Sequence, residues 1–350
     1  MIATTLTSLA LAAALAVPVG GPVPAYPQDD PALPDVSAPE WIVYDATADV
    51  VLASWNANDR RSMASVTKVM TAIVVLENAS PDDIVEVPAF ATRTRGSVAG
   101  LVAGDRMTVN DLLVAMLVRS GNDAALTLAA HVGGGSVDAF VAKMNAKARE
   151  LGMNDTRFAN PNGLDDEQHF STANDLLTLI KASRDYPDIG RIASIKLVKT
   201  AADSTGQSKH LKNTNRLLGA YPGVVGLKTG DTPWADKVLL GVAERGPRTL
   251  MTVVMGSKDH FADTRELLEW GFATYGLRDR MLRPFYAEQG GGGLPPTDLE
   301  LTEGHERRLY AMPRLDNGRW AMSSLADLPR SREFGSWLKE ALPGVVEGDS

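Results

Sequence analysis

The order of apolar segments along the chain is the feature that most constrains its fold. Two short strand-like runs come first, a long helical block follows, two longer strand-like runs come next, and a helix ends the series. These segments are Trp41–Tyr44 and Val50–Trp55, about residues 110–184, Val238–Ala243 and Thr249–Met255, and Ala262–Thr274. Strands, then helices, then strands predict an α+β fold in which an antiparallel sheet packs against a helical block.

The helical block divides into separate helices. A polar break at Ser120–Asp123 interrupts the helical pattern, and three consecutive glycines stop it again at residues 133–135. We therefore expect four helices, at Asp111–Val118, Ala124–His131, Ser136–Leu151 and Ala173–Arg184. After about Pro187 the pattern changes to that of strands.

The ends of the chain differ from its middle. Residues 1–25 contain a short apolar run and small residues at 23–25, which indicates a signal peptide and export, although no Lys or Arg precedes the run. Residues 26–37 are rich in Pro and Asp and predict a linker. The main domain then covers residues 38–275. Residues 276–350, with a turn signal at Asp316–Gly318, predict a small β-rich C-terminal appendage and a tail.

Composition excludes several kinds of function. The chain has 350 residues, a net charge of −8 and no long basic cluster, so we expect no nucleic-acid partner. It has no cysteine, and its five histidines form no H-x-x-x-H pair, so we expect no metal and no cofactor. No apolar segment near the C-terminus is long enough to span a membrane, which leaves membrane association open.

Ser65 and Lys68 stand three residues apart at the start of an apolar helical run. Residues i and i+3 lie on one face of a helix, so the serine hydroxyl and the lysine amine can be neighbours. A serine becomes a good nucleophile when a base takes its proton, and a lysine can be that base when burial or a second cation keeps it neutral. Ser336 and Lys339 repeat the same spacing, so the pattern alone is weak.

Two further motifs carry suitable side chains. Ser120-Gly121-Asn122 falls between two helices, where a hydroxyl could relay a proton and an amide could hold a carbonyl; its structural alternative is helix capping. Lys228-Thr229-Gly230 ends an apolar, strand-like run, and its structural alternative is an edge strand entering a turn. In the functional interpretation Lys228 attracts an anion, Thr229 binds a carboxylate and Gly230 permits close approach of the backbone.

The three motifs occur in the order S-x-x-K, S-x-N and K-T-G, close to the signature of penicillin-binding proteins and class A β-lactamases. The sequence resembles the low-molecular-weight penicillin-binding proteins, which are serine-type D-alanyl-D-alanine carboxypeptidases. The resemblance covers about residues 38–275, and the segments that carry it are Ala64–Ala72, Arg119–Ala125, Ser171–Leu176 and Gly226–Gly230.

The resemblance implies a role for each motif residue. Ser65 would attack the carbonyl between the last two D-alanines of a peptidoglycan stem peptide, and Lys68 would take its proton. Ser120 would pass a proton to the leaving D-alanine, Asn122 would hold the peptide, and Lys228 and Thr229 would bind the terminal carboxylate. The N–H groups of Ser65 and Asp231 would stabilise the oxyanion. β-Lactam antibiotics would acylate the same serine and leave slowly.

Three features depart from the family pattern. Asp236 stands where the family commonly has glycine, which affects the expected strand geometry. Asp231 places a negative charge beside the expected anion site of Lys228 and Thr229. The usual C-terminal membrane anchor is not evident.

Other functions remain open at this stage. A class A-like β-lactamase needs a glutamate that activates water, and the acidic stretch Asp165–Glu167 lacks the expected context. A peptidoglycan endopeptidase would use the same residues. A non-catalytic wall-binding or penicillin-sensing module is the alternative from another class of protein.

Overall fold

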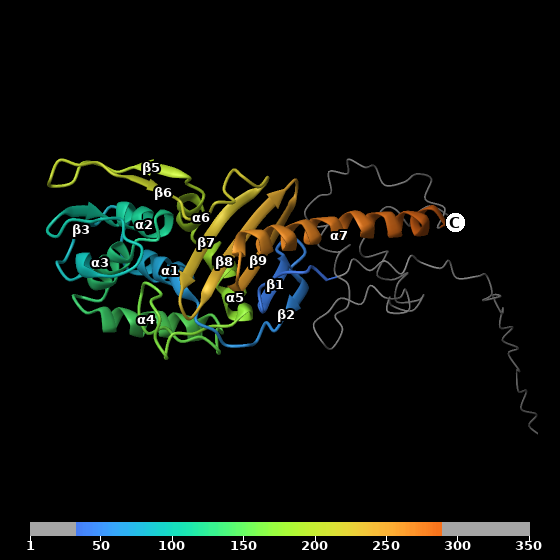
Figure 1. Cartoon of the computed structure of the whole chain (residues 1–350), viewed down its shortest axis with the longest axis horizontal. Coiled ribbons are helices and arrows are strands. Elements are labelled where there is room, and N and C mark those ends of the chain that lie inside the picture. Colours follow the sequence, from blue (N-terminus) through green and yellow to red (C-terminus); the bar gives the residue numbers. More distant parts are fainter. Residues whose placement is uncertain (1–32, 289–350) are drawn as a thin grey trace, which may run out of the picture.

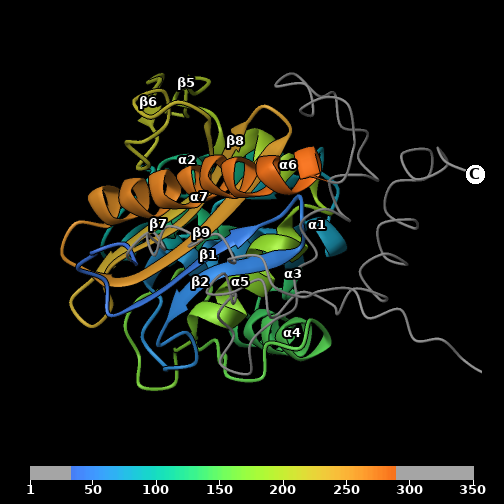
Figure 2. The same ribbon diagram turned by 90° about the vertical axis from the view of Figure 1, so that its right-hand side faces the viewer.

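The structure, a computed structural model, describes residues 33–288, with side chains described as far as Thr274. A five-stranded antiparallel sheet lies in the middle, with a block of helices on one face and a single long helix across the other (Figures 1 and 2). This arrangement confirms the predicted α+β fold with an antiparallel sheet packed against helices.

The sheet combines strands from the beginning and from the end of the domain's sequence. Its strands are β1 (Glu40–Asp45), β2 (Val50–Trp55), β7 (Val224–Thr232), β8 (Asp236–Arg245) and β9 (Arg248–Ser257). Their order is β2-β1-β9-β8-β7, and β1 pairs with β9 so that Trp41 faces Val254. The strand β7 is therefore an edge strand, free on one side to meet the helical block.

Alternation along the strands divides the core in two, because successive side chains point to opposite faces of a sheet. Ile42, Leu240 and Val253 pack with the helical block, whereas Val43 and Leu239 pack in a second cluster on the other face. The helix α7 (His260–Glu288) covers that second face (Figure 2). Both faces of the sheet are thus buried, which is why the middle parts of its central strands are mostly apolar.

The four predicted helices of the block are confirmed. A 3₁₀ turn, η1 (Ala64–Thr67), leads into the first helix, and the helices are α1 (Lys68–Asn78), α2 (Val109–Val118), α3 (Asn122–Val132), α4 (Val137–Glu150), α5 (Ala173–Ser183) and α6 (Pro187–Ala193). Shorter elements complete the block: β3 (Ile84–Glu86), η2 (Ala91–Arg93), β4 (Arg106–Thr108), β5 (Leu197–Lys199) and β6 (His210–Lys212).

The structure corrects the expectation that strands begin after Pro187. The helix α6 starts there, because proline suits the first turn of a helix and Ile189 and Ile192, three residues apart, bury the same side. The short hairpins β3-β4 and β5-β6 were not predicted, since three-residue strands carry too little periodicity.

The last helix is longer than expected. The pattern predicts it at Ala262–Thr274, and α7 continues to Glu288, past the boundary expected at residue 275. The predicted signal peptide at 1–25, most of the predicted linker at 26–37 and residues 289–350 of the predicted appendage lie outside the described residues.

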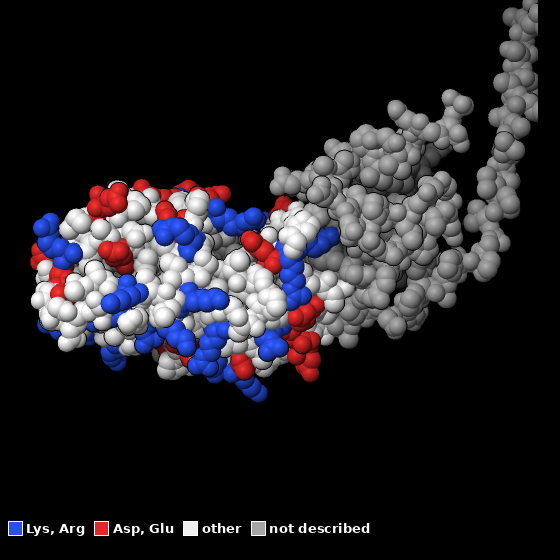
Figure 3. Space-filling model, turned by 90° about the horizontal axis from the view of Figure 1, so that it is seen from above, with Lys and Arg blue, Asp and Glu red and all other residues white. Residues whose placement is uncertain are grey.

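Within residues 33–288, no single helix has the length and apolarity of a membrane span; α3 and α4 reach them only as a pair bent by 88°. On the face that Figure 3 shows, both basic and acidic side chains lie among uncharged ones.

Candidate active site

Ser65 and Lys68 meet where η1 passes into α1. Ser65 lies in the 3₁₀ turn, and Lys68 is the first residue of the α-helix. The distance from Lys68 Nζ to Ser65 Oγ is 2.9 Å. The S-x-x-K spacing therefore brings a hydroxyl and an amine into hydrogen-bond contact.

Lys68 is wholly buried. Its Nζ also donates to Asn122 Oδ1 at 2.7 Å and to the main-chain oxygen of Asn162 at 2.5 Å. Burial lowers the pKa of Lys68 well below its usual value, and the positive charge of Lys228 lowers it further, against a smaller opposite effect of Asp123. A neutral amine has two N–H groups for the two asparagine oxygens, which leaves its lone pair for the Ser65 hydroxyl.

Ser120 and Asn122 project from the break between α2 and α3. Ser120 has a left-handed backbone, with φ of +63°, and Asn122 is the first residue of α3. The amide of Asn122 bridges Lys68 and the main-chain oxygen of Arg95, to which its Nδ2 donates at 2.6 Å. The polar break in the helical pattern thus places two side chains of this segment in the site.

Lys228 and Thr229 lie on the edge strand β7. Lys228 is buried, and its Nζ donates to Ser120 Oγ and to the main-chain oxygen of Thr229, both at 2.9 Å. Thr229 Oγ1 donates to Thr214 Oγ1 at 2.7 Å. Burial lowers the pKa of Lys228 to about 7. The three motifs therefore form one cluster, in which Asn122 joins Lys68 and Ser120 joins Lys228.

Gly230 lets the edge strand approach the serine. A Cβ atom added there would lie 2.8 Å from Ala64 Cβ and 3.0 Å from the main-chain nitrogen of Ser65. Any side chain at this position would push β7 away from η1. The sequence interpretation expected close backbone approach at Gly230, and the structure shows that its neighbour is the turn that carries Ser65.

The two aspartates that depart from the family pattern take different places. Asp231 is exposed on β7 and pairs in register with Lys237 of β8. Asp236 is exposed at the first position of β8 with φ of +53°. That conformation is free for glycine and tolerated by aspartate better than by most residues. The strand pairing continues through it, with Asp236 opposite Thr232.

The loop at residues 160–166 supplies contacts that sequence reasoning missed. Besides the Asn162 oxygen on Lys68, the carboxylate of Asp165 accepts from Ser62 Oγ at 3.3 Å, Thr232 Oγ1 at 2.6 Å and the Trp234 main-chain N–H at 3.2 Å. Asp165 thereby ties this loop to the end of β7. The Asn-Pro-Asn-Gly turn signal was visible in the sequence, but it does not say what the turn touches.

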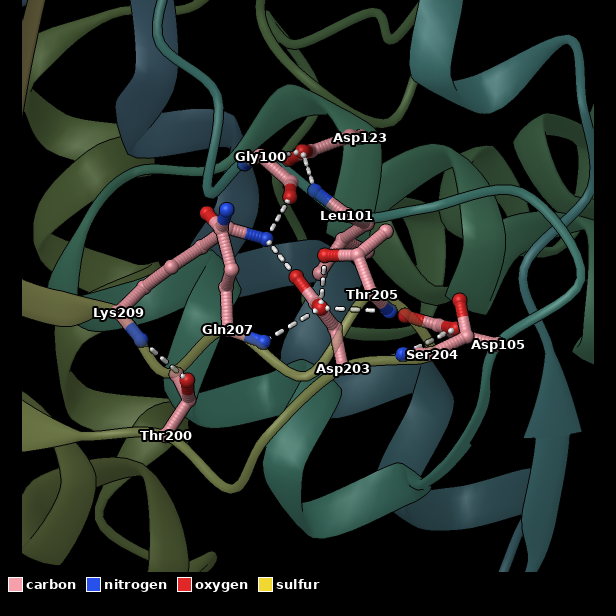
Figure 4. A network of polar contacts seen from close by, with 10 residues as sticks. All are labelled: Gly100, Leu101, Asp105, Asp123, Thr200, Asp203, Ser204, Thr205, Gln207 and Lys209. Carbon is pink, nitrogen blue, oxygen red and sulfur yellow. Dashed lines mark hydrogen bonds and ion pairs between the residues drawn. The ribbon is translucent and has the colours of Figure 1, made fainter.

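Asp123 anchors a second loop beside the site. Its carboxylate accepts from the main-chain N–H groups of Ala99, Gly100 and Leu101 at 2.8–3.0 Å. From the other side, Lys209 donates to the main-chain oxygen of Gly100 and forms an ion pair with Asp203 at 2.8 Å (Figure 4). The β5-β6 hairpin thus holds the loop that precedes the Ser120 segment.

A metal centre finds no support in the described part of the chain, where no three His, Cys, Asp or Glu side chains gather closely enough to hold an ion. The chemistry available at the cluster is that of a serine, two lysines, and hydroxyl and amide groups.

Comparison with known proteins agrees with this geometry. A family profile described as D-alanyl-D-alanine carboxypeptidase matches residues 27–259. The D-alanyl-D-alanine carboxypeptidase DacF of Bacillus subtilis (strain 168) is 36% identical over 233 residues, which are 64% of this chain and 59% of DacF. A D-alanyl-D-alanine endopeptidase of Escherichia coli (strain K12) is 33% identical over 243 residues, covering 68% of this chain and 78% of that protein.

A solved structure has the same fold. The crystal structure of the Streptomyces K15 DD-transpeptidase superposes with a TM-score of 0.66 at 31% identity, covering 69% of this chain and 98% of that one. The profile match covers more than half of the chain and includes all three motifs. The chain therefore belongs to the D-alanyl-D-alanine carboxypeptidase family.

Proposed function

We propose that this protein is a serine D-Ala-D-Ala carboxypeptidase that removes the terminal D-alanine from peptidoglycan stem peptides through an acyl-enzyme on Ser65. The contact that carries the proposal is the 2.9 Å distance between Ser65 Oγ and the amine of the buried Lys68. A neutral amine at this distance is a base in place for the hydroxyl proton.

In the first half-reaction, Ser65 Oγ bonds to the carbonyl carbon between the two D-alanines while Lys68 takes the hydroxyl proton. The oxyanion that forms accepts from the main-chain N–H groups of Ser65 and Asp231. As the tetrahedral intermediate collapses, the C–N bond breaks and a proton reaches the leaving nitrogen through Ser120. D-Alanine leaves. Water then bonds to the acyl carbon while Lys68 takes a proton from it, the bond from that carbon to Ser65 Oγ breaks, and Lys68 returns the proton to the serine as the shortened peptide leaves as a carboxylate.

In this proposal Lys228 and Thr229 bind the terminal carboxylate of the substrate. The Lys228 amine is buried and lies 2.9 Å from Ser120 Oγ, so its charge acts at short range in a site with little water. A bound carboxylate favours the charged form of this lysine and raises its pKa from the value near 7. Substrate binding and the charge of Lys228 therefore support each other.

An endopeptidase that cuts cross-links is the second candidate, because a relative with that name matches the chain and the same residues would serve it. A class A-like β-lactamase fits less well. The loop at residues 160–166 presents to Lys68 a main-chain oxygen of Asn162 and no carboxylate that could activate a deacylating water.

We propose further that the protein is exported and acts in the periplasm or elsewhere in the cell envelope outside the cytoplasm. The apolar run near the N-terminus supports this, as does the place of peptidoglycan outside the cytoplasmic membrane. N-terminal sequencing of the mature protein tests it, since export predicts cleavage near Ala25 and an intact residue 1 contradicts it.

Intact-mass analysis with benzylpenicillin tests the catalytic proposal. Wild-type protein is expected to gain the mass of one penicillin, and Ser65→Ala none, because the acyl bond forms on Ser65. A pentapeptide ending in D-Ala-D-Ala should then release D-alanine with the wild type only. An adduct without peptide cleavage indicates the penicillin-sensing module, and rapid hydrolysis of penicillin without an adduct indicates a β-lactamase. If the protein neither forms an adduct nor hydrolyses penicillin, the proposal is overturned.

A further inference from the structure

His169 is a buried titratable group that the mechanism above does not use. Its side chain is 1% exposed, and the ring of Phe158 meets it edge-on at 5.9 Å between ring centroids. It lies outside the three motifs and is 102 residues from Thr67 along the sequence. In space, however, its Nε2 is 2.7 Å from Oγ1 of Thr67 in the nucleophile turn.

The contacts of His169 determine which ring nitrogen carries the proton. The main-chain N–H of Ala159 donates to Nδ1 at 3.0 Å, so Nδ1 is unprotonated. A neutral ring then has its proton on Nε2, and Nε2–H donates to Thr67 Oγ1. A second proton on Nδ1 would place two donors face to face, so this arrangement holds only for the neutral ring.

Thr67 connects His169 with Ala64, the residue before the nucleophile. Its hydroxyl donates to the main-chain oxygen of Ala64 at 2.8 Å, which leaves the oxygen lone pairs for Nε2–H of His169. Ala64 has φ of +49°, an uncommon conformation for a residue other than glycine. Such a backbone persists only where neighbouring groups hold it.

The oxygen of Ala64 and the N–H of Ser65 belong to one peptide group. A trans peptide is planar, and its C=O and N–H point in opposite directions. A hydroxyl that holds the oxygen of Ala64 therefore also sets the direction of the Ser65 N–H. A hydrogen bond on the oxygen also polarises the group and strengthens the N–H as a donor.

We propose that His169 and Thr67 are positioning residues that aim the Ser65 N–H at the oxyanion, by way of the Ala64–Ser65 peptide group. This inference rests on the proposed function, because it assigns the support of one donor in that oxyanion hole. Both residues are buried, so we expect them to act on the rate of acylation and not on binding of the substrate carboxylate.

The surroundings keep the hydrogen bonds from His169 to Thr67 and from Thr67 to Ala64 intact at neutral pH. Burial lowers the pKa of His169 to about 4, with Lys68 acting in the same direction and Asp166 and Asp165 opposing it. The ring is therefore neutral at neutral pH, as its hydrogen bonds with Ala159 and Thr67 require.

Thr67→Val is the sharpest test, because it removes the hydroxyl and keeps the shape. The rate constant of acylation by benzylpenicillin at saturation is expected to fall about 10- to 100-fold, less than the 10²- to 10³-fold typical of losing an oxyanion donor outright. The dissociation constant of the non-covalent complex with benzylpenicillin, which forms before acylation, should change less than about threefold. Thr67→Ser keeps the hydroxyl and should recover most of the rate.

His169 is tested by two substitutions of different hydrogen-bonding capacity. His169→Phe removes the donor and is expected to slow acylation, whereas His169→Gln can still donate to Thr67 and should lose less. If the two residues act in one chain, His169→Phe combined with Thr67→Val should be no slower than Thr67→Val alone.

Thr274→Val is the matched control. Thr274 is also buried and donates to a main-chain oxygen at 2.8 Å, but it lies on α7, across the sheet from the site. The Thr274→Val variant should lose stability as Thr67→Val does, but it should keep the wild-type acylation rate. Equal acylation rates for wild type, Thr67→Val and Thr274→Val would overturn the positioning role proposed for Thr67 and His169. A wild type that penicillin does not acylate would instead overturn the proposed function itself.

Discussion

At the scale of single residues, two buried lysines in one site have opposite tasks. Lys68 acts as a base only when neutral, and Lys228 attracts a carboxylate only when charged. Burial lowers the pKa of both, and the charge of Lys228 lowers that of Lys68 further. Because the positive charge of Lys228 lowers the pKa of Lys68, the site favours the state in which Lys68 is neutral and Lys228 is charged.

This charge state predicts the pH dependence of acylation. The second-order rate constant with benzylpenicillin reflects the free protein, so it should rise as Lys68 loses its proton and fall above about pH 7 as Lys228 loses its own. In Lys228→Arg the guanidinium stays charged, so the fall should disappear from pH 7 to 9 even though the rate is lower. Lys237→Arg, on the neighbouring strand, should keep the wild-type profile, and a fall that persists in Lys228→Arg would contradict the assignment.

At the scale of elements, the site depends on how loops are attached to α3. The carboxylate of Asp123 holds three successive N–H groups of the loop at residues 99–101, and the β5-β6 hairpin holds the same loop through Lys209 (Figure 4). Asp123 immediately follows Asn122, which contacts Lys68. Disturbing this loop therefore disturbs the base as well.

Asp123→Asn tests the attachment. The amide presents N–H donors to main-chain N–H groups, so the free energy of unfolding should fall by about 1–3 kcal/mol and the acylation rate should fall with it. Asp138→Asn, on the exposed first turn of α4, makes the same change without a loop to hold. Urea unfolding and penicillin acylation of both variants provide the measurement, and equal behaviour of the two variants would disprove the attachment.

At the scale of the whole molecule, a buried neutral histidine lies on each side of the sheet. His169 lies with the helical block, and His260 begins α7 on the opposite side. Burial lowers the pKa of each to about 4 from the usual 6.5. The unfolded chain therefore binds protons between pH 6.5 and 4 that the folded protein does not.

Stability should consequently be fully present above pH 6.5 and fall as the pH is lowered towards 4. Between pH 6.5 and 5 each histidine should remove roughly 2 kcal/mol from the free energy of unfolding. His260→Gln should remove about half of that loss and leave penicillin acylation at pH 7 unchanged, since His260 is remote from the site. Urea midpoints measured from pH 5 to 7.5 check this, and an identical pH dependence in wild type and His260→Gln would refute it.

The success of the sequence predictions depended on how far a pattern extends along the chain. Long periodic segments such as Val137–Glu150 and Arg248–Ser257 were predicted correctly, because many side chains carry the same period. The seven-residue helix α6 was taken for the start of a strand region, since two buried isoleucines are too few to establish a period. Three-residue strands gave no signal at all.

Local chemistry was readable from the sequence wherever it depended on neighbours along the chain. The order of strands and helices indicated the α+β fold, and the spacing of Ser65 and Lys68 placed a hydroxyl beside an amine. The contacts between distant segments were decided only by tertiary packing. His169 reaches Thr67 across 102 positions and Lys228 reaches Ser120 across 108, because residues so far apart share no period and are joined only when the elements that carry them pack together.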